Sequence, residues 1–169
     1  RISESATCHL TPINDTDFLS TNGDRTVVAR RWSSDELQFE TLFQMSLLEK
    51  IARRPLILPS KDEPLRVVLA DVKGAVLLYE GAKLERLAKA WRPIGANGVP
   101  AGTISSGPYL KVVENQQRIG YVVNGKQFVW IDPENDRLDW MYAAKGLIGE
   151  PLVVGSQLWL TAGDKLVLV

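Results

Sequence analysis

Apolar residues in this chain come in short runs that are paired around a turn, a pattern typical of β-hairpins. The clearest pairs flank Asn22-Gly23 and Asn124-Gly125, and this dipeptide favours a tight hairpin turn because both residues tolerate a positive φ. Two further pairs turn near Lys73-Gly74 and at Gly163-Asp164. Valine, leucine and aromatic residues fill the runs on either side, as strands buried on both faces require. The sequence therefore predicts four hairpins along one chain.

Each hairpin is preceded by a proline and a short apolar run, so the hairpins belong to a repeated unit. The prolines are Pro12, Pro55, Pro108 and Pro151, at intervals of 43, 53 and 43 residues. Proline is expected at the first residue of a strand, where its missing N–H costs no ladder hydrogen bond. Repeats of roughly 40–50 residues are typical of the blades of a β-propeller. The predicted repeats are approximately 12–54, 55–107, 108–150 and 151–169.

A blade needs a fourth strand after its hairpin, and residues 37–45 are the clearest candidate. The positions predicted to share one face are Leu37, Phe39, Thr41, Phe43 and Met45. Leu42 interrupts the polar face opposite them. A helix is the alternative, because Ser33 and Glu36 form a capping-box pattern just before this segment. We favour the strand, which keeps the register of the other repeats.

These repeats predict an all-β fold of four-stranded antiparallel blades, in a single domain over residues 1–169. The chain is long enough for about three and a half blades, whereas closed propellers usually have about four to eight. Either the chain is part of a larger propeller, or residues 1–10 supply the missing outer strand of a small closed ring. We favour the larger propeller, because four-bladed rings are rare. Since the chain begins with Arg1 and has no leader, we expect a processed product or an excised part.

Charge and hydropathy exclude two classes of partner. The chain has 20 basic and 20 acidic residues and a formal net charge of zero, so nothing draws it to a phosphate backbone or an anionic lipid. Its longest apolar runs, such as Ala75 to Tyr79, are far shorter than the ~20 residues that span a bilayer. We expect no nucleic-acid partner and no membrane insertion. The compartment stays open, because a single cysteine fits any of them.

The stretch from Trp130 to Trp140, W-I-D-P-E-N-D-R-L-D-W, resembles the tryptophan-docking motif A-x-D-x-x-T-G-K-x-x-W of PQQ-like (quinoprotein-type) β-propeller repeats. Asp132 and Trp140 stand at the spacing of that family, and Arg137 takes the place of its basic residue. The family's alanine, threonine and glycine are replaced by Trp130, Asn135 and Asp136. The resemblance implies that a turn after the third strand returns the chain, so that Trp140 covers the seam to the next blade.

The first repeat is closer to a WD40-like blade. Asp24 follows the turn glycine, and Arg31-Trp32 ends the strand after it. The residues for which we predict a structural role in blade seams and turns are Trp140, Asp132, Trp130, Trp91, Gly23, Gly74, Gly125 and Gly163. Five tryptophans could also line a surface on which a ligand stacks, and Trp130 is the strongest candidate because it replaces a small residue. Packing in the core or the seams is the favoured role.

No arrangement of residues specifies a reaction, and we predict no catalytic, cofactor-binding or metal-binding residue. Cys8 and His9 are neighbours, but adjacent residues on a strand point to opposite faces and do not form a nucleophile–base pair. Two such ligands are also too few for structural zinc. The acidic residues between Asp132 and Asp139 suit a turn, because Asp caps its own backbone, and they lack the pattern of an EF-hand.

The predicted function is a non-catalytic propeller module, a binding or scaffold unit without a cofactor. Its partner is expected to be another protein or the remainder of its own longer chain. This rests on analogy at the level of the fold. Two alternatives are kept. One is a fragment of a PQQ-dependent quinoprotein dehydrogenase. The single cysteine argues against this alternative, because those enzymes carry an adjacent cysteine pair. The other is a module that binds carbohydrate or the cell envelope through exposed tryptophans.

Overall fold

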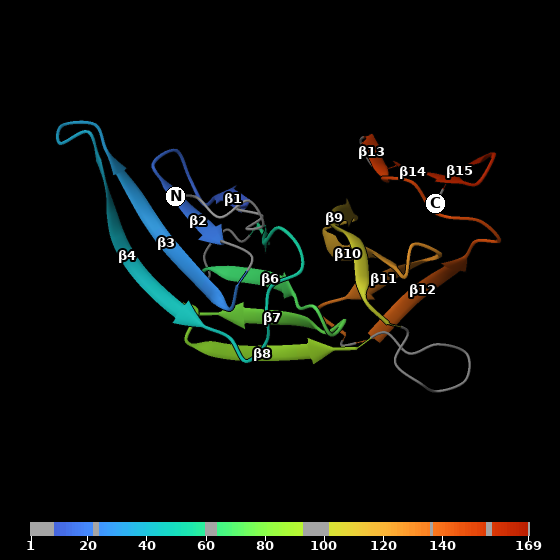
Figure 1. The fold of residues 1–169 in the computed structure, drawn as a ribbon, viewed down its shortest axis with the longest axis horizontal. Helices are drawn as coiled ribbons and strands as arrows, with labels where there is room; N and C mark the ends of the chain where they lie inside the picture. Colours follow the sequence, from blue (N-terminus) through green and yellow to red (C-terminus); the bar gives the residue numbers. More distant parts are fainter. Residues whose placement is uncertain are drawn as a thin grey trace. The chain divides into compact units, whose positions relative to one another are not determined.

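The computed structural model describes residues 9–21, 24–59, 64–92, 102–135, 137–154 and 157–168, except for the side chains of Val113 and residues 137–141 (Figure 1). Over these ranges the chain forms successive antiparallel sheets whose strands pair in sequence order. Three sheets have four strands, and the last has three. The predicted all-β fold of four-stranded antiparallel units is confirmed.

The strands follow one another with short connections, as in meandering sheets. The first sheet consists of β1 (His9–Pro12), β2 (Asp17–Thr21), β3 (Thr26–Ser33) and β4 (Gln38–Ser46). The second consists of β5 (Leu56–Ile57), β6 (Arg66–Ala70), β7 (Val76–Glu80) and β8 (Arg86–Trp91). The third consists of β9 (Ile104–Val113), β10 (Gln116–Val123), β11 (Gln127–Asp132) and β12 (Arg137–Ala143). The last consists of β13 (Leu152–Val154), β14 (Gln157–Ala162) and β15 (Lys165–Leu168).

The sheets belong to two compact units. The first unit contains the first sheet and most of the second, and the second unit contains the third and last sheets together with the turn at Lys73–Ala75. Each unit has a core in which one sheet packs on the next. In the first unit this core joins Leu19 and Val27 of the first sheet to Val67 and Leu69 of the second.

In the second unit the core joins Phe128 and Trp130 of the third sheet to Leu158 and Leu160 of the last. Gly120 explains how a tryptophan fits there, because it lies directly across the ladder from Trp130. A Cβ added at Gly120 would come within 2.8 Å of the Trp130 ring and 2.5 Å of the Phe128 ring. The missing side chain on one strand is therefore the space that the aromatic rings of the next strand fill.

Three of the predicted hairpin glycines lie in turns with a positive φ. Gly74 has a φ of +83°, Gly125 of +66° and Gly163 of +65°. Asn124 precedes Gly125 with a φ of +51°, so two successive residues of this turn are left-handed, a conformation that Asn and Gly tolerate better than other residues. Gly23 lies outside the described residues.

The prediction of proline at strand starts holds only in part. Pro55 and Pro151 directly precede β5 and β13, but Pro12 ends β1 and Pro108 lies inside β9. The register explains Pro108: Tyr109 pairs with Gly120 and Ser106 with Val122, so two residues of β9 face one residue of β10. Such a bulge leaves an unpaired position in the strand, where proline's missing N–H costs no hydrogen bond.

Residues 38–45 belong to strand β4 (Gln38–Ser46), whereas Leu37 lies in the turn before it, and the helical alternative is wrong. The predicted single face is also wrong. Thr41 pairs with Arg30 and Phe43 with Ala29, so Leu42 is an extra residue in a bulge. Because a bulge shifts the alternation by one position, Phe43 packs against the core of the first unit, whereas Phe39 lies on the opposite face, beside Trp32. Leu42 is the residue at which the alternation breaks.

The described part of residues 1–10 does not form the fourth strand of the last sheet. His9 pairs with Thr21 and Leu10 with Ser20, so both residues belong to β1 of the first sheet.

The linker of residues 47–52, which leaves β4, is hydrogen-bonded to the hairpin turns of two sheets. The Ile51 amide donates to the Asp24 carbonyl of the first sheet over 2.9 Å. The Ala52 amide donates to the Ala70 carbonyl of the second sheet over 2.7 Å, and the Lys50 carbonyl accepts from Val72 over 2.9 Å.

The linker of residues 144–149, which leaves β12, repeats this pattern. The Ile148 amide donates to the Gly125 carbonyl of the third sheet over 2.7 Å, and the Gly149 amide donates to the Thr161 carbonyl of the last sheet over 2.9 Å. The Leu147 carbonyl accepts from Gly163 over 3.0 Å. The same backbone geometry thus joins neighbouring sheets in both units, as a duplicated repeat requires.

Candidate interaction surface

One face of the first sheet carries large apolar side chains that the described residues leave uncovered. Alternation along β2 and β3 sends Leu19, Val27 and Ala29 into the core of the first unit, where all three are fully buried. The residues between them point the other way. We call this second face the open face of the first sheet and define it by Leu10, Phe18, Val28, Trp32 and Phe39.

Three aromatic rings form the centre of the open face of the first sheet. Phe39 stands edge-on to Phe18 with 5.2 Å between ring centroids, and it lies 4.8 Å from Trp32. Despite these contacts, Phe39 is 53% exposed and Trp32 38% exposed, and neighbouring Leu10 is 58% exposed. The rings therefore pack on one another and still present their outer surfaces to solvent.

A hollow of about 360 Å³ opens on this face. Leu10, Phe18, Val28 and Phe39 supply its apolar walls, and Ser20 and Arg30 supply polar groups. The combination of aromatic rings, aliphatic walls and one arginine is typical of the buried centre of a protein interface. The lining of this hollow therefore offers mainly apolar contact.

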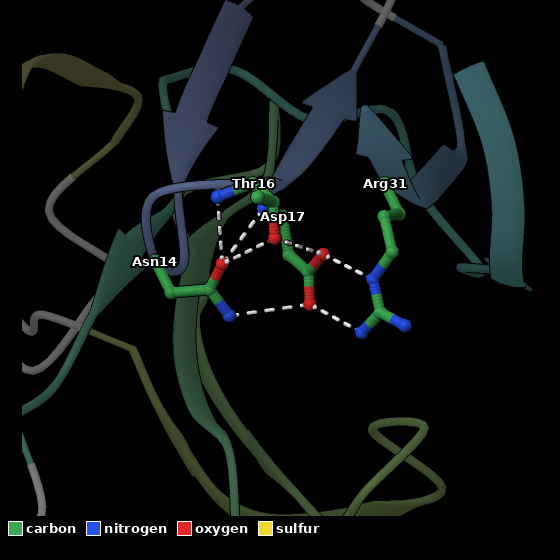
Figure 2. Close-up of polar contacts among 4 residues, drawn as sticks. All are labelled: Asn14, Thr16, Asp17 and Arg31. Atoms are coloured by element: carbon green, nitrogen blue, oxygen red, sulfur yellow. Dashed lines mark hydrogen bonds and ion pairs between the residues drawn. The ribbon is translucent and has the colours of Figure 1, made fainter. Parts of the chain in front are cut away.

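A polar cluster on the opposite side of the first sheet fixes β3, the strand that carries Trp32 (Figure 2). The Arg31 guanidinium donates two hydrogen bonds to the Asp17 carboxylate, over 2.7 and 2.9 Å. The Asn14 amide nitrogen donates to the same carboxylate over 3.2 Å, and the Thr16 hydroxyl over 3.1 Å. Because Trp32 directly follows Arg31 on a strand, fixing Arg31 on one face fixes Trp32 on the other.

The Asp17 carboxylate is held in its charged form. The hydrogen bonds from Arg31 are the main cause, and together with those from Asn14 and Thr16 they outweigh the opposing effect of burial. They lower the pKa of Asp17 to about 2. The loop between β1 and β2 is tied further, because the Trp32 amide donates to the Thr16 carbonyl over 2.9 Å.

Asp132, predicted as a turn residue, is fully buried at the end of β11. Its carboxylate accepts hydrogen bonds from the backbone amides of Glu134 and Asn135, over 3.0 and 3.1 Å, and from the Asn135 side chain over 2.7 Å. The Arg118 guanidinium lies 3.3 Å away. Burial alone would raise the pKa of Asp132, but these hydrogen bonds and the Arg118 charge lower it below its ordinary value.

The predicted tryptophans whose side chains are described lie on different strands. Trp130 is buried in the core of the second unit, with the Lys111 ammonium 5.7 Å from its ring centroid. Trp91 is half-buried at the end of β8, and Trp159 is half-buried on β14. The side chain of Trp140 lies outside the described residues, as does Cys8. Only Trp32 belongs to the open face of the first sheet.

Sequence reasoning missed Leu10, Phe18 and Phe39 as functional candidates. The available signal was the alternation of Phe18 with Leu19 and of Val28 with Val27 and Ala29, which makes both faces of the hairpin apolar. By itself, that pattern predicts burial on both faces.

In the part of the chain that the structure describes, no helix is long and apolar enough to cross a membrane. No group of three or more His, Cys, Asp or Glu side chains among the described residues is placed to hold a metal ion.

The comparisons by sequence find nothing: no protein-family model and no curated protein matches this chain. Solved structures match it by fold. BamB from Moraxella catarrhalis is 13% identical with a TM-score of 0.59, and the match covers 92% of this chain and 47% of that chain. The β-propeller domain of Cps50 (Swd1) from Myceliophteria thermophila is 11% identical with a TM-score of 0.59, covering 88% of this chain and 46% of that chain.

A third similar structure is BBS1N, which was solved in complex with ARL6DN. It is 8% identical with a TM-score of 0.62, and the match covers 96% of this chain and 50% of that chain. At these identities the likeness concerns the fold alone. The chain thus has a β-propeller-type fold, and it spans about half the length of the propeller proteins that it matches.

Proposed function

We propose that this chain is a non-catalytic β-propeller module that binds another protein, or another domain of its own polypeptide, through the open face of its first sheet. The observation that carries the proposal is the exposure of Leu10, Trp32 and Phe39 on one sheet face, where Phe39 packs against Trp32 and lines a hollow together with Leu10. Contiguous exposed apolar patches on folded proteins mark interaction sites. The aromatic residues add to this, because they are enriched in the buried centres of interfaces.

The local geometry supports a docking surface that exists before its partner arrives. Arg31 and Asp17 hold the end of β3, and Phe39 is fixed against both Phe18 and Trp32. A surface whose side chains are already ordered loses little conformational entropy on binding, which favours affinity. BBS1N was solved in complex with ARL6DN, so a propeller chain of similar fold can hold a protein partner.

We also propose that the segment 130–140 is a PQQ-like propeller repeat with a structural role. Support comes from Asp132, whose carboxylate accepts the backbone amides of Glu134 and Asn135 and so closes the turn that the motif requires. This role involves no quinone cofactor.

Site-specific photo-crosslinking in the native host tests the proposed function. A photoreactive phenylalanine analogue replaces Phe39 in one variant and Leu48 in a matched control, because Leu48 is 89% exposed but lies in the linker after β4. We expect discrete protein adducts from position 39 that position 48 does not give. If neither position gives adducts, or both give the same ones, the open face of the first sheet is not a protein-binding surface.

A further inference from the structure

A second hollow lies within the second unit, between the linker of residues 144–149 and the hairpin turn of the last sheet. Its volume is about 450 Å³, which falls in the range of about 300–1,000 Å³ that is typical of small-molecule sites. Tyr142 and Gly146 line it from β12 and the linker, and Gly163 lines it from the turn. We call it the linker hollow. It shares no residue with the hollow on the open face of the first sheet.

Three charged side chains line the linker hollow, and two of them are cations: Lys145, Lys165 and Asp164. All three are exposed. Within the described part of the chain, neither lysine ammonium group forms a hydrogen bond or an ion pair. The lining therefore has a positive charge in excess, and a concave surface of one sign attracts ligands of the opposite sign.

The backbone of the linker adds hydrogen-bond donors to this hollow. The Ile148 amide donates to the Gly125 carbonyl, whereas the amides of Lys145 and Gly146 have no acceptor among the described residues. Successive amides of a turn that are free to donate form anion-binding concavities. Lysine complements them as a point charge that binds phosphate.

The linker of the first unit has an acidic residue at the equivalent point. Ile51 and Ile148 each form an isolated bridge with the sheet that follows, so the two linkers align residue by residue. Two positions earlier, the first linker has Glu49 and the second has Gly146. A Cβ at Gly146 would come within 3.1 Å of the Gly163 Cα, so a side chain there would crowd the turn. The second linker therefore lacks both the bulk and the negative charge that the first one has.

We propose that the linker hollow binds the phosphate group of a small anionic ligand. The ammonium groups of Lys145 and Lys165 supply the charge, and the amides of Lys145 and Gly146 supply hydrogen bonds. The carboxylate of Asp164 opposes binding, because it repels an anion. Since the excess of positive charge is small and the lysines are exposed to solvent, inorganic phosphate should bind with millimolar affinity.

Backbone amide chemical shifts, followed by NMR while inorganic phosphate is added to the full chain, test this site. We expect saturable shifts at the amides of Lys145, Gly146 and Asp164. Sodium chloride at the same ionic strength shows what general screening of charges contributes. The inference is overturned if these amides do not shift, or if chloride shifts them as much as phosphate does.

Substitutions that change the charge in opposite directions test the chemistry of the site. Lys145→Gln and Lys165→Gln should each weaken phosphate binding by about three- to tenfold, because each removes one ammonium group. Asp164→Asn should strengthen it by a similar factor, because it removes the repelling carboxylate. Lys83→Gln and Asp35→Asn are the matched controls, since both residues are exposed in the first unit and do not line the hollow.

Gly146→Glu, which gives the second linker the acidic residue of the first, should abolish phosphate binding. If circular dichroism shows that this variant does not fold, the lysine variants decide, because substitutions of exposed side chains usually leave the fold intact. Phosphate binding that neither lysine substitution weakens, or that Asp164→Asn weakens, would contradict the proposed site. None of these measurements involves position 39, so the proposed function keeps its own test.

Discussion

Asp17 shows how a single carboxylate organises one end of the first sheet. It accepts hydrogen bonds from Asn14 and Thr16 in the loop before it and from Arg31 on the neighbouring strand. Its side chain is only 9% exposed, whereas that of Arg31 is 51% exposed. Solvent therefore partly screens the charges of this pair. The bidentate hydrogen bond contributes more to its strength than the Coulomb attraction does.

Asp17→Asn is expected to lower the free energy of unfolding at pH 7 by about 1–2 kcal/mol, because it removes a charged acceptor from Arg31. The pKa of Asp17 is about 2 in the folded chain and about 3.9 in an unfolded one. A lowered pKa stabilises the folded state above the unfolded value, and this contribution disappears as the pH falls towards 2. The difference between wild type and variant should thus shrink between about pH 4 and pH 2.

Urea denaturation at several pH values measures this difference. Asp15→Asn is the control, because Asp15 is exposed in the same loop and a surface change of this kind usually costs less than about 0.5 kcal/mol. A difference that is the same at pH 7 and pH 2 would show that the charge of Asp17 has no part in the cluster.

The sequence predicts some of these residue roles and not others. Asp132 is predicted as a turn residue because it stands in a recognisable motif; it lies at the end of β11, and its carboxylate accepts a backbone amide of the turn that follows. The partnership of Asp17 with Arg31 depends on the register of β2 against β3, which brings together residues 14 positions apart. Likewise, the burial of Trp130 depends on Gly120 lying across the ladder. The spacing of residue types along the chain does not predict the register between strands.

At the scale of elements, the linkers after the outer strands hydrogen-bond to the turns of the sheets that they connect. The linkers of residues 47–52 and 144–149 make the same backbone hydrogen bonds to the turns on either side of them. They therefore position neighbouring sheets by main-chain contacts that do not depend on side-chain identity. This explains how repeats of such different sequence keep one geometry.

The amides of Ile51, Ala52, Ile148 and Gly149 are expected to exchange slowly with solvent, although they lie outside the named strands. Exchange requires the hydrogen bonds between linker and turn to open, and such opening costs free energy where the surrounding side chains are buried. Ile51 and Ile148 are both buried. Hydrogen exchange followed by NMR should show rates at least about 100-fold below that of the exposed Asp35 amide. Rates equal to that of Asp35 would mean that the linkers do not hold the sheets together.

Strand existence was predictable, but strand detail was not. The hairpins and β4 follow from alternation and turn residues, which are local properties of the sequence. The bulges at Leu42 and beside Pro108 shift that alternation by one position. A bulge depends on pairing with a neighbouring strand, so the predicted faces of β4 were wrong even though the strand was predicted correctly.

At the scale of the whole molecule, each unit has its own core, and stability should follow that division. Leu160 is fully buried in the core of the second unit. Leu160→Ala is expected to cost about 2–5 kcal/mol, as other leucine truncations in cores do. In repeat architectures each unit contacts only its neighbours, so the loss should concentrate in the second unit. Hydrogen exchange should show reduced protection over residues 104–168, and an equal loss over residues 9–90 would contradict separate cores.

The repeat architecture was predictable from the sequence, but the open face of the first sheet was not. A sheet between two others is apolar on both faces, and the strands of the first sheet have that composition. Alternation indicates which residues could be buried without indicating whether a neighbour is present to bury them. Phe18 and Phe39 therefore resemble interior residues in the sequence, and their exposure is visible only once the sheets have been assembled.

Because of the hydrogen-bonded linkers, the two ends of each sheet differ in how well they should tolerate inserted sequence. One end carries the turns to which the linkers bind, so added sequence there would push neighbouring sheets apart. The opposite end carries exposed turns, such as Ser34 to Glu36 between β3 and β4 and Ala82 to Lys83 between β7 and β8 (Figure 1). A fluorescent label or an affinity tag spliced in at Ala82 would leave the main-chain contacts between sheets untouched.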